Sequence, residues 1–255
     1  MTDLTPNISL VAVHGNGGGA SRYTTFTAAV GDRLHVQAVT LPGFSTTPRD
    51  PSLTTVAAYA DRLAELFEPF ERPPVVLGHG IGGSFVLDLA SRRPEVMSGL
   101  ILHAPVGANL DTRLFPRIMS TAPVRALAKR LIAARLPRPL WRRLFFPHGA
   151  PRPVLDTFFD EYRHCQAFGQ MFEIISPAWF EALEPVHTVP TVVLWGEHDR
   201  VLRSGQADVI LAKVPGAEVV VQPGWDHFPM IEQPEEYADA IIAIARRLAA
   251  GDAPA

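Results

Sequence analysis

Cysteine, lysine and long apolar runs are nearly absent from this sequence. Cys165 is the single cysteine among 255 residues, which excludes a disulfide within the chain and a metal site built from cysteines. No stretch of about 18 apolar residues occurs, and the first residues lack the basic segment and cleavable apolar stretch of a secretion signal. We therefore expect a soluble, cytoplasmic protein that does not contact membranes.

A strong charge of either sign is also missing. The chain carries 23 Lys and Arg against 26 Asp and Glu, a formal net charge of −3, and only two of its basic residues are lysines. Nucleic-acid binding requires a broad basic surface, so we expect no such partner. With 47% hydrophobic residues, the chain has the composition and length of a single large α/β domain. We expect neither a metal nor a cofactor.

Short apolar runs alternate with helix-like runs along most of the chain. Strands of a parallel sheet covered on both faces have this appearance, so the alternation predicts a mostly parallel, doubly wound α/β sheet. The expected strands, each apolar on both faces, cover residues 8–13, 36–40, 75–77, 100–102, 191–195 and 218–221. The expected helices cover residues 54–67, 83–92, 206–213 and 234–248.

Residues 107–187 interrupt the alternation. This stretch contains helix-like pieces broken by prolines and no run typical of a strand, which predicts an inserted helical subdomain. The sheet would then be built from residues 1–106 and 188–255. Within the insertion, residues 112–155 contain ten Arg or Lys and no Asp or Glu.

The stretch "GHGIGGS" at residues 78–84 lies between an expected strand and an expected helix. This is the context of the G-x-S-x-G turn that presents a nucleophilic serine in many hydrolases. Its central position is Gly80, which carries no nucleophile. Glycine adopts the strained backbone of such a turn at little cost, so the turn is expected to persist without its hydroxyl group.

Three further motifs follow expected strands. "VAVHGNGGGA" places a His-Gly turn after the first, "VLWGEHDRV" places Asp199 after the fifth, and "GWDHFPM" places His227 before the last helix. With the Gly80 turn, they occur in the order turn, acid, histidine. In this order and context the chain resembles the α/β-hydrolase fold superfamily, with a helical lid inserted after the sixth strand of that fold.

The resemblance implies a role for each matching position. Asp199 would orient His227, and His227 would act as the general base. The backbone N–H groups of Asn16 and Ile81 would form an oxyanion hole. The nucleophile position is Gly80, where this sequence departs from the superfamily, so a covalent acyl-enzyme is not expected.

Other side chains near these motifs have less specific interpretations. Ser84 is read as a serine at a helix N-terminus and Cys165 as an inert buried thiol. Two carboxylates, Glu197 and Asp226, are alternatives to Asp199. Four residues are expected to be structural or to line a pocket: His14, His79, His103 and Trp225.

Three functions are compatible with a His227–Asp199 dyad that lacks a serine. The favoured one is general acid–base chemistry on a small apolar carbonyl compound, as a β-elimination (lyase) step such as loss of acetate or water in secondary metabolism. Within this function, direct hydrolysis by a water molecule that His227 activates is also open. The alternatives are a serine esterase, lactonase or thioesterase inactivated at Gly80, and a non-catalytic ligand-binding or receptor-like protein. The basic lid would be either a solvated surface or a contact for an acyl carrier protein or coenzyme A.

Overall fold

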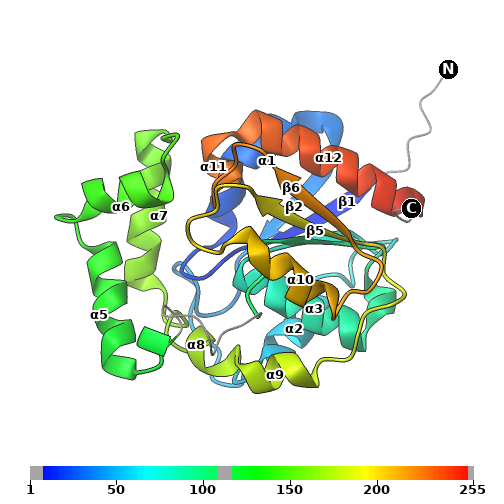
Figure 1. Ribbon diagram of the computed structural model, residues 1–255, viewed down its shortest axis with the longest axis horizontal. Coiled ribbons are helices and arrows are strands. Elements are labelled where there is room, and N and C mark those ends of the chain that lie inside the picture. The colour runs from blue at the N-terminus through cyan, green and yellow to red at the C-terminus, as the bar shows by residue number, and fades with distance from the viewer. Residues whose placement is uncertain (1–7, 108–116, 252–255) are drawn as a thin grey trace.

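A six-stranded parallel sheet forms the centre of the molecule (Figure 1). The structure is a computed structural model that describes residues 8–107 and 117–251. The strand order is β2-β1-β3-β4-β5-β6. The strands are β1 Ser9–Val13, β2 His35–Val39, β3 Val75–His79, β4 Gly99–His103, β5 Thr191–Gly196 and β6 Glu218–Gln222.

All six expected strands are present, and every neighbouring pair is parallel. The expectation that each is apolar on both faces is wrong for two of them. The central strands β3, β4 and β5 are buried at every position. In the edge strands β2 and β6, exposed and half-buried residues alternate, and only Val39 is buried. An edge strand has one neighbour and less cover from the helices, so part of its surface meets water.

Helices cover both faces of the sheet. α1 (Thr24–Val30) packs against α12 (Pro234–Ala250), and α2 (Val56–Glu65) packs against α3 (Ile81–Arg92) on the other face (Figure 1). Thr55 caps α2 by accepting a hydrogen bond from the N–H of Ala58, and Gly251 ends α12 in a left-handed conformation. Two short helices, α10 (Ala207–Leu211) and α11 (Pro229–Glu232), follow β5 and β6. The sequence patterns did not predict α1.

Between β4 and β5, the described residues form five helices joined by turns and loops, and no strand. The helices are α5 Ala122–Ala133, α6 Arg138–Phe145, α7 Arg152–His164, α8 Met171–Ile174 and α9 Pro177–Ala182. Within this sheet the inserted helices follow the fourth strand, β4, and precede β5. Helices α5 to α7 lie together at one end of the molecule (Figure 1).

Glycine is favoured at two positions of the turn between β3 and α3, for different reasons. Gly80 has φ +56° and ψ −117°, a backbone conformation that side-chain-bearing residues rarely adopt. At Gly82 a Cβ atom would lie 2.5 Å from the carbonyl oxygen of Val13 and 2.7 Å from that of His14. The helix can therefore approach β1 closely only without a side chain at this position.

We expect Gly82→Ala to lower the free energy of unfolding by about 1–3 kcal/mol, because the added methyl group pushes against backbone that cannot move aside. Urea unfolding measures the change. The matched control is Gly205→Ala, where a Cβ atom would have no neighbour within 4 Å. Equal midpoints for the two variants would contradict the close approach.

Candidate active site

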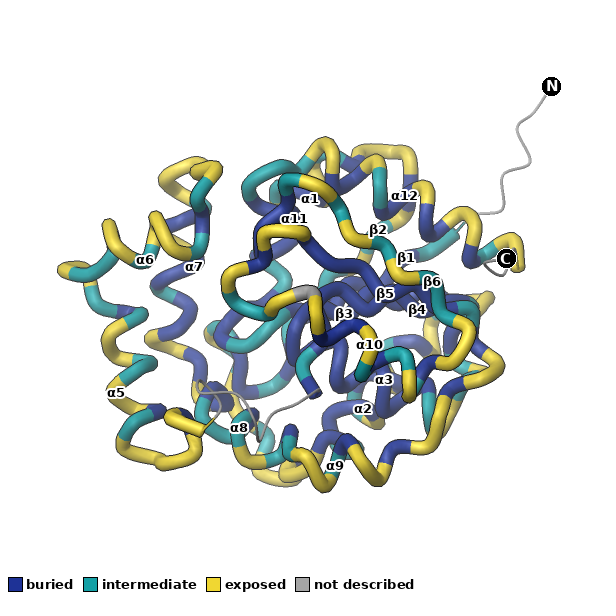
Figure 2. Tube along the Cα trace, in the orientation of Figure 1, coloured by how far each residue is buried: buried dark blue, intermediate teal, exposed yellow. Residues whose placement is uncertain are grey.

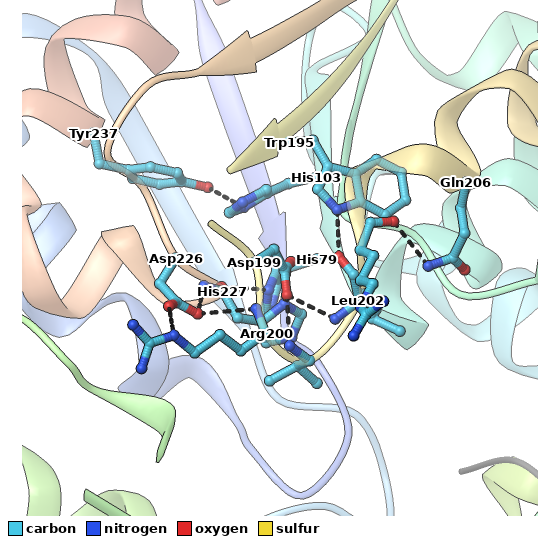
Figure 3. Close-up of polar contacts among 12 residues, drawn as sticks. His79, His103, Trp195, Asp199, Arg200, Leu202, Gln206, Asp226, His227 and Tyr237 are labelled. Carbon is cyan, nitrogen blue, oxygen red and sulfur yellow. Dashed lines mark hydrogen bonds and ion pairs between the residues drawn. The ribbon is translucent and has the colours of Figure 1, made fainter. Parts of the chain in front are cut away.

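Asp199 and His227 meet at the carboxyl ends of β5 and β6 (Figure 3). His227 Nδ1 lies 2.7 Å from Asp199 Oδ2, and both side chains are buried. Asp199 Oδ1 accepts hydrogen bonds from the N–H groups of Val201 (2.8 Å) and Leu202 (2.6 Å). These donors stabilise the carboxylate, which also accepts a hydrogen bond from Nδ1–H of His227. Nε2 of His227 is left unprotonated, as a general base requires.

Asp226 does not contact the imidazole ring of its neighbour. Its Oδ1 accepts hydrogen bonds from the N–H groups of His227 (2.8 Å) and Arg200 (3.2 Å), and its Oδ2 lies 3.1 Å from Nε of Arg200. Glu197 is exposed and its carboxylate lies beside Gly224. Asp199 is thus the carboxylate that contacts the His227 ring, and Asp226 holds the two loops together.

His79 contacts both the backbone and the ring of His227. Its Nε2 lies 3.1 Å from the carbonyl oxygen of His227, and the two rings are 4.5 Å apart. Burial, reinforced by the neighbouring His227 and His103, holds the pKa of His79 well below its ordinary value. A neutral His79 that donates from Nε2 fixes the backbone of the His227 loop on the end of the sheet.

An open space lies beside Gly80. A Cβ atom built there would have Gly15 Cα, at 3.6 Å, as its one neighbour within 4 Å. The backbone N–H groups of Asn16 and Ile81 make no hydrogen bond with any other described residue. Ile81 is the first residue of α3, so its N–H is one of the free donors of a helix N-terminus.

His14, His103 and Trp225 are buried in the core. His14 Nε2 accepts from the N–H of Leu41, and burial lowers its pKa to about 4. His103 Nδ1 lies 3.1 Å from the hydroxyl of Tyr237, and burial lowers its pKa to about 3 (Figure 3). Trp225 donates to Glu236.

The surroundings of Ser84 and Cys165 disfavour a catalytic role for either residue. The Ser84 hydroxyl is buried and donates to the carbonyl oxygen of Val106 at 2.6 Å. Burial raises the pKa of the Cys165 thiol to about 11, which disfavours the thiolate that a nucleophile needs.

Helix α7 covers the loop that carries Asn16. Arg22 Nε lies 3.2 Å from Glu161 Oε2, both side chains are buried, and the guanidinium stacks on Phe158 at 3.4 Å. Tyr162 packs so close to Gly17 that a Cβ atom there would overlap its ring. The sequence analysis missed the Arg22–Glu161 pair, because the partners are far apart in the chain and neither lies in a motif.

The basic character of residues 112–155 is partly neutralised in the fold. Arg125 pairs with Glu173, and Arg138 pairs with Asp156 and Asp160 on α7. The charge count over residues 112–155 did not include these carboxylates, because Asp156, Asp160 and Glu173 follow that stretch in the sequence. A cavity of about 370 Å³, lined by Arg142, Arg143, Phe146 and Arg200 among others, lies between α6 and the Asp199 loop.

Glu232 lies near this cavity and carries a perturbed carboxyl group. Burial, with Asp226 nearby, raises its pKa from 4.5 to about 7. Two interactions oppose this rise: Oε1 accepts a hydrogen bond from the N–H of His148, and the positive charge of Arg200 favours the carboxylate. A raised carboxyl pKa in the folded state contributes stability below pH 4.5, which is lost as the pH rises through 7.

We therefore expect Glu232→Gln to gain thermal stability relative to the native chain between pH 5 and pH 8, because glutamine keeps the acceptor without a buried charge. Thermal unfolding at the two pH values measures this gain. Glu235→Gln removes a charge from an exposed position of α12 and is the control. A gain that does not grow with pH would contradict the raised pKa.

Comparisons with known proteins agree with this architecture. A family model described as "Alpha/beta hydrolase family" matches residues 10–240. The chain is 22% identical to the monoacylglycerol lipase ABHD6 of Rattus norvegicus, over 92% of this chain and 74% of that protein. An esterase of Exiguobacterium antarcticum superposes with a TM-score of 0.77, at 14% identity over 95% of this chain and 93% of the other. A variant of an epoxide hydrolase of Bacillus megaterium superposes with a TM-score of 0.74, at 14% identity over 92% of each chain. The chain belongs to the alpha/beta hydrolase family.

Proposed function

We propose that this protein is an enzyme in which the Asp199–His227 dyad performs general acid–base chemistry on a carbonyl compound, without a covalent intermediate. The observation that carries the proposal is a buried dyad at 2.7 Å whose His227 ring lies 4.5 Å from that of His79, the residue before an elbow position that has room for a side chain and no nucleophile. A base of this kind next to two N–H donors suits removal of a proton adjacent to a carbonyl group.

The favoured reaction is β-elimination. The substrate carbonyl oxygen accepts hydrogen bonds from the N–H groups of Asn16 and Ile81, and Nε2 of His227 removes the α-proton. The C–H electron pair moves into the enolate, whose negative oxygen the two N–H groups stabilise. The enolate then forms the new C=C bond as the bond to the β-leaving group breaks. The imidazolium returns its proton to the departing acetate, or to hydroxide to give water.

The space at Gly80 has a specific use in this reaction. The missing hydroxymethyl group leaves room for the α-carbon to approach the base, and no side-chain nucleophile competes for the carbonyl carbon. Helix α7 over the Asn16 loop would act as the lid that excludes water from the enolate.

Hydrolysis by a water molecule that His227 activates is the second candidate. The same space beside Gly80 favours it, because a water molecule there would occupy the place of the missing hydroxyl. The named relatives also include a lipase and an esterase. In that reaction His227 takes a proton from water instead of from carbon.

One probe separates these reactions. The compound 4-acetoxybutan-2-one carries an acidic α-proton and a β-acetate. Elimination converts it to methyl vinyl ketone and acetate, whereas hydrolysis gives 4-hydroxybutan-2-one and acetate. NMR of the reaction with the native chain identifies the products. Methyl vinyl ketone formed above the rate in buffer supports elimination, and 4-hydroxybutan-2-one supports hydrolysis. Binding without either product would overturn the proposal in favour of a ligand-binding protein.

A further inference from the structure

Helices α5 and α6 expose an unusual number of large apolar side chains. Six of the eight large apolar residues that stand out as exposed in the described chain lie here or in the flanking turns: Ile118, Leu127, Leu131, Leu136, Leu140 and Leu144. Leu136, in the turn between the helices, is 93% exposed. Figure 2 shows α5 and α6 at one end of the molecule, coloured mostly as exposed or intermediate.

The two helices repeat one arrangement. The sequences "LAKRL" at 127–131 and "LWRRL" at 140–144 each place two leucines four residues apart, with an arginine immediately before the second. Residues four apart share one face of a helix, so each helix presents a leucine pair flanked by basic groups. Ala128 and Trp141, each next in sequence to the first leucine of its pair, pack against the core. Trp141 also donates to the carbonyl oxygen of Leu131, which ties α6 to the end of α5.

The basic residues of this surface are available to a partner. Lys129, Arg130, Arg135, Arg142 and Arg143 form no ion pair with any other residue in 8–107 or 117–251. The acidic residues nearest in sequence pair instead with Arg138 and Arg152. Exposed leucines and basic side chains without an ion pair therefore occur together on α5, on α6 and in the turn between them.

From this surface we infer that α5 and α6 dock the protein on an anionic lipid bilayer. The leucine side chains would enter the interface while the arginine and lysine side chains pair with lipid phosphates, the arrangement of helices that lie in the plane of a membrane surface. No helix in the described ranges has the length and hydropathy needed to cross a bilayer, so the contact is peripheral. This inference departs from the sequence-based expectation of no membrane contact.

Charge decides between a bilayer and a second copy of the chain. A symmetric dimer through this surface would bring the same arginines of two copies together, and like charges at close range oppose association. An anionic bilayer supplies both an apolar phase for the leucines and negative charge for the arginines. It also needs no groove of matching shape, which suits leucines that project from two helices and a turn.

Vesicle co-sedimentation tests the inference with the full chain. We expect binding to phosphatidylcholine vesicles that contain about 30% phosphatidylglycerol, weaker binding to pure phosphatidylcholine, and release at about 0.5 M salt. The paired changes Leu136→Ser with Leu140→Ser, and Arg142→Gln with Arg143→Gln, should each weaken binding at least about tenfold.

The matched control is Val219→Ser with Val221→Ser, which removes two exposed apolar side chains from β6. Binding that the control reduces as much as the helix variants would overturn the inference, as would no binding of the native chain. Sedimentation velocity without vesicles tests the competing occupant. The surface would be a contact between copies if the native chain formed a dimer and did not bind vesicles, and if the leucine changes dissociated that dimer. Neither readout depends on turnover of any substrate.

Discussion

We expect Gly80→Ser to hydrolyse p-nitrophenyl acetate at least about 100-fold faster than the native chain, because general-base activation of the new hydroxyl contributes about 10²–10⁴ in rate. The site holds the other parts that this reaction needs. The dyad is formed at 2.7 Å, and the N–H groups of Asn16 and Ile81 have no other partner among the described residues. The new Cβ atom would have Gly15 Cα at 3.6 Å as its nearest neighbour.

The backbone conformation of Gly80 will cost the serine variant about 1–3 kcal/mol of stability, since φ is +56°. Gly80→Ala carries the same strain without a hydroxyl and is the matched control. Adding His227→Ala to the serine variant should return hydrolysis to the native level. Equal rates for the serine and alanine variants would contradict the placement of the dyad and the oxyanion hole.

The serine variant also distinguishes the proposed elimination enzyme from an esterase that has lost its nucleophile. Under the proposed function, its added side chain should slow elimination of acetate from 4-acetoxybutan-2-one, because it fills the space beside the base. A native chain inert towards that probe, together with an efficient serine variant, would instead identify an esterase whose nucleophile has been replaced.

His227→Ala and Asp199→Asn should each slow elimination of acetate from 4-acetoxybutan-2-one by about 10²–10⁴. The alanine variant removes the base. In the asparagine variant, Oδ1 still accepts from Val201 and Leu202, so the side-chain NH₂ group faces Nδ1 of His227. The ring then carries its proton on Nε2 and can no longer accept one there. The rate of methyl vinyl ketone formation measures both changes.

Asp226→Asn is the control for a buried carboxylate in the same loops. Its Oδ1 holds the backbone N–H groups of His227 and Arg200, an acceptor role that asparagine retains. We expect less than about a tenfold loss, and circular dichroism will verify that all three variants fold. If Asp226→Asn were as damaging as Asp199→Asn, the assignment of roles within the loops would be wrong. Added imidazole should partly restore His227→Ala if the lost group is a base.

The fold was largely predictable because its signals are local. Each strand is a short apolar run, and the runs of the central strands lie within a residue or two of the observed bounds. Helix α1 was missed because its sequence, TTFTAAV, is short and rich in threonine, which favours helix weakly. The edge strands were expected to be more apolar and more buried than they are. A short apolar stretch of sequence does not indicate whether its strand has a neighbour on each side.

The sequence by itself determined the order of the motifs, the glycine at the elbow position 80, the histidine, and the three carboxylates that could pair with it, of which Asp199 was favoured. Only the tertiary structure decided which carboxylate contacts the His227 ring, because Asp199 and Asp226 lie in two loops that meet only when β5 and β6 pair. It also decided that Arg22 is buried against Glu161, and that the leucines of α5 and α6 face outward. The physical reason is common to all three. Burial, charge pairing and exposure depend on contacts between residues far apart in the chain, and local pattern does not record them.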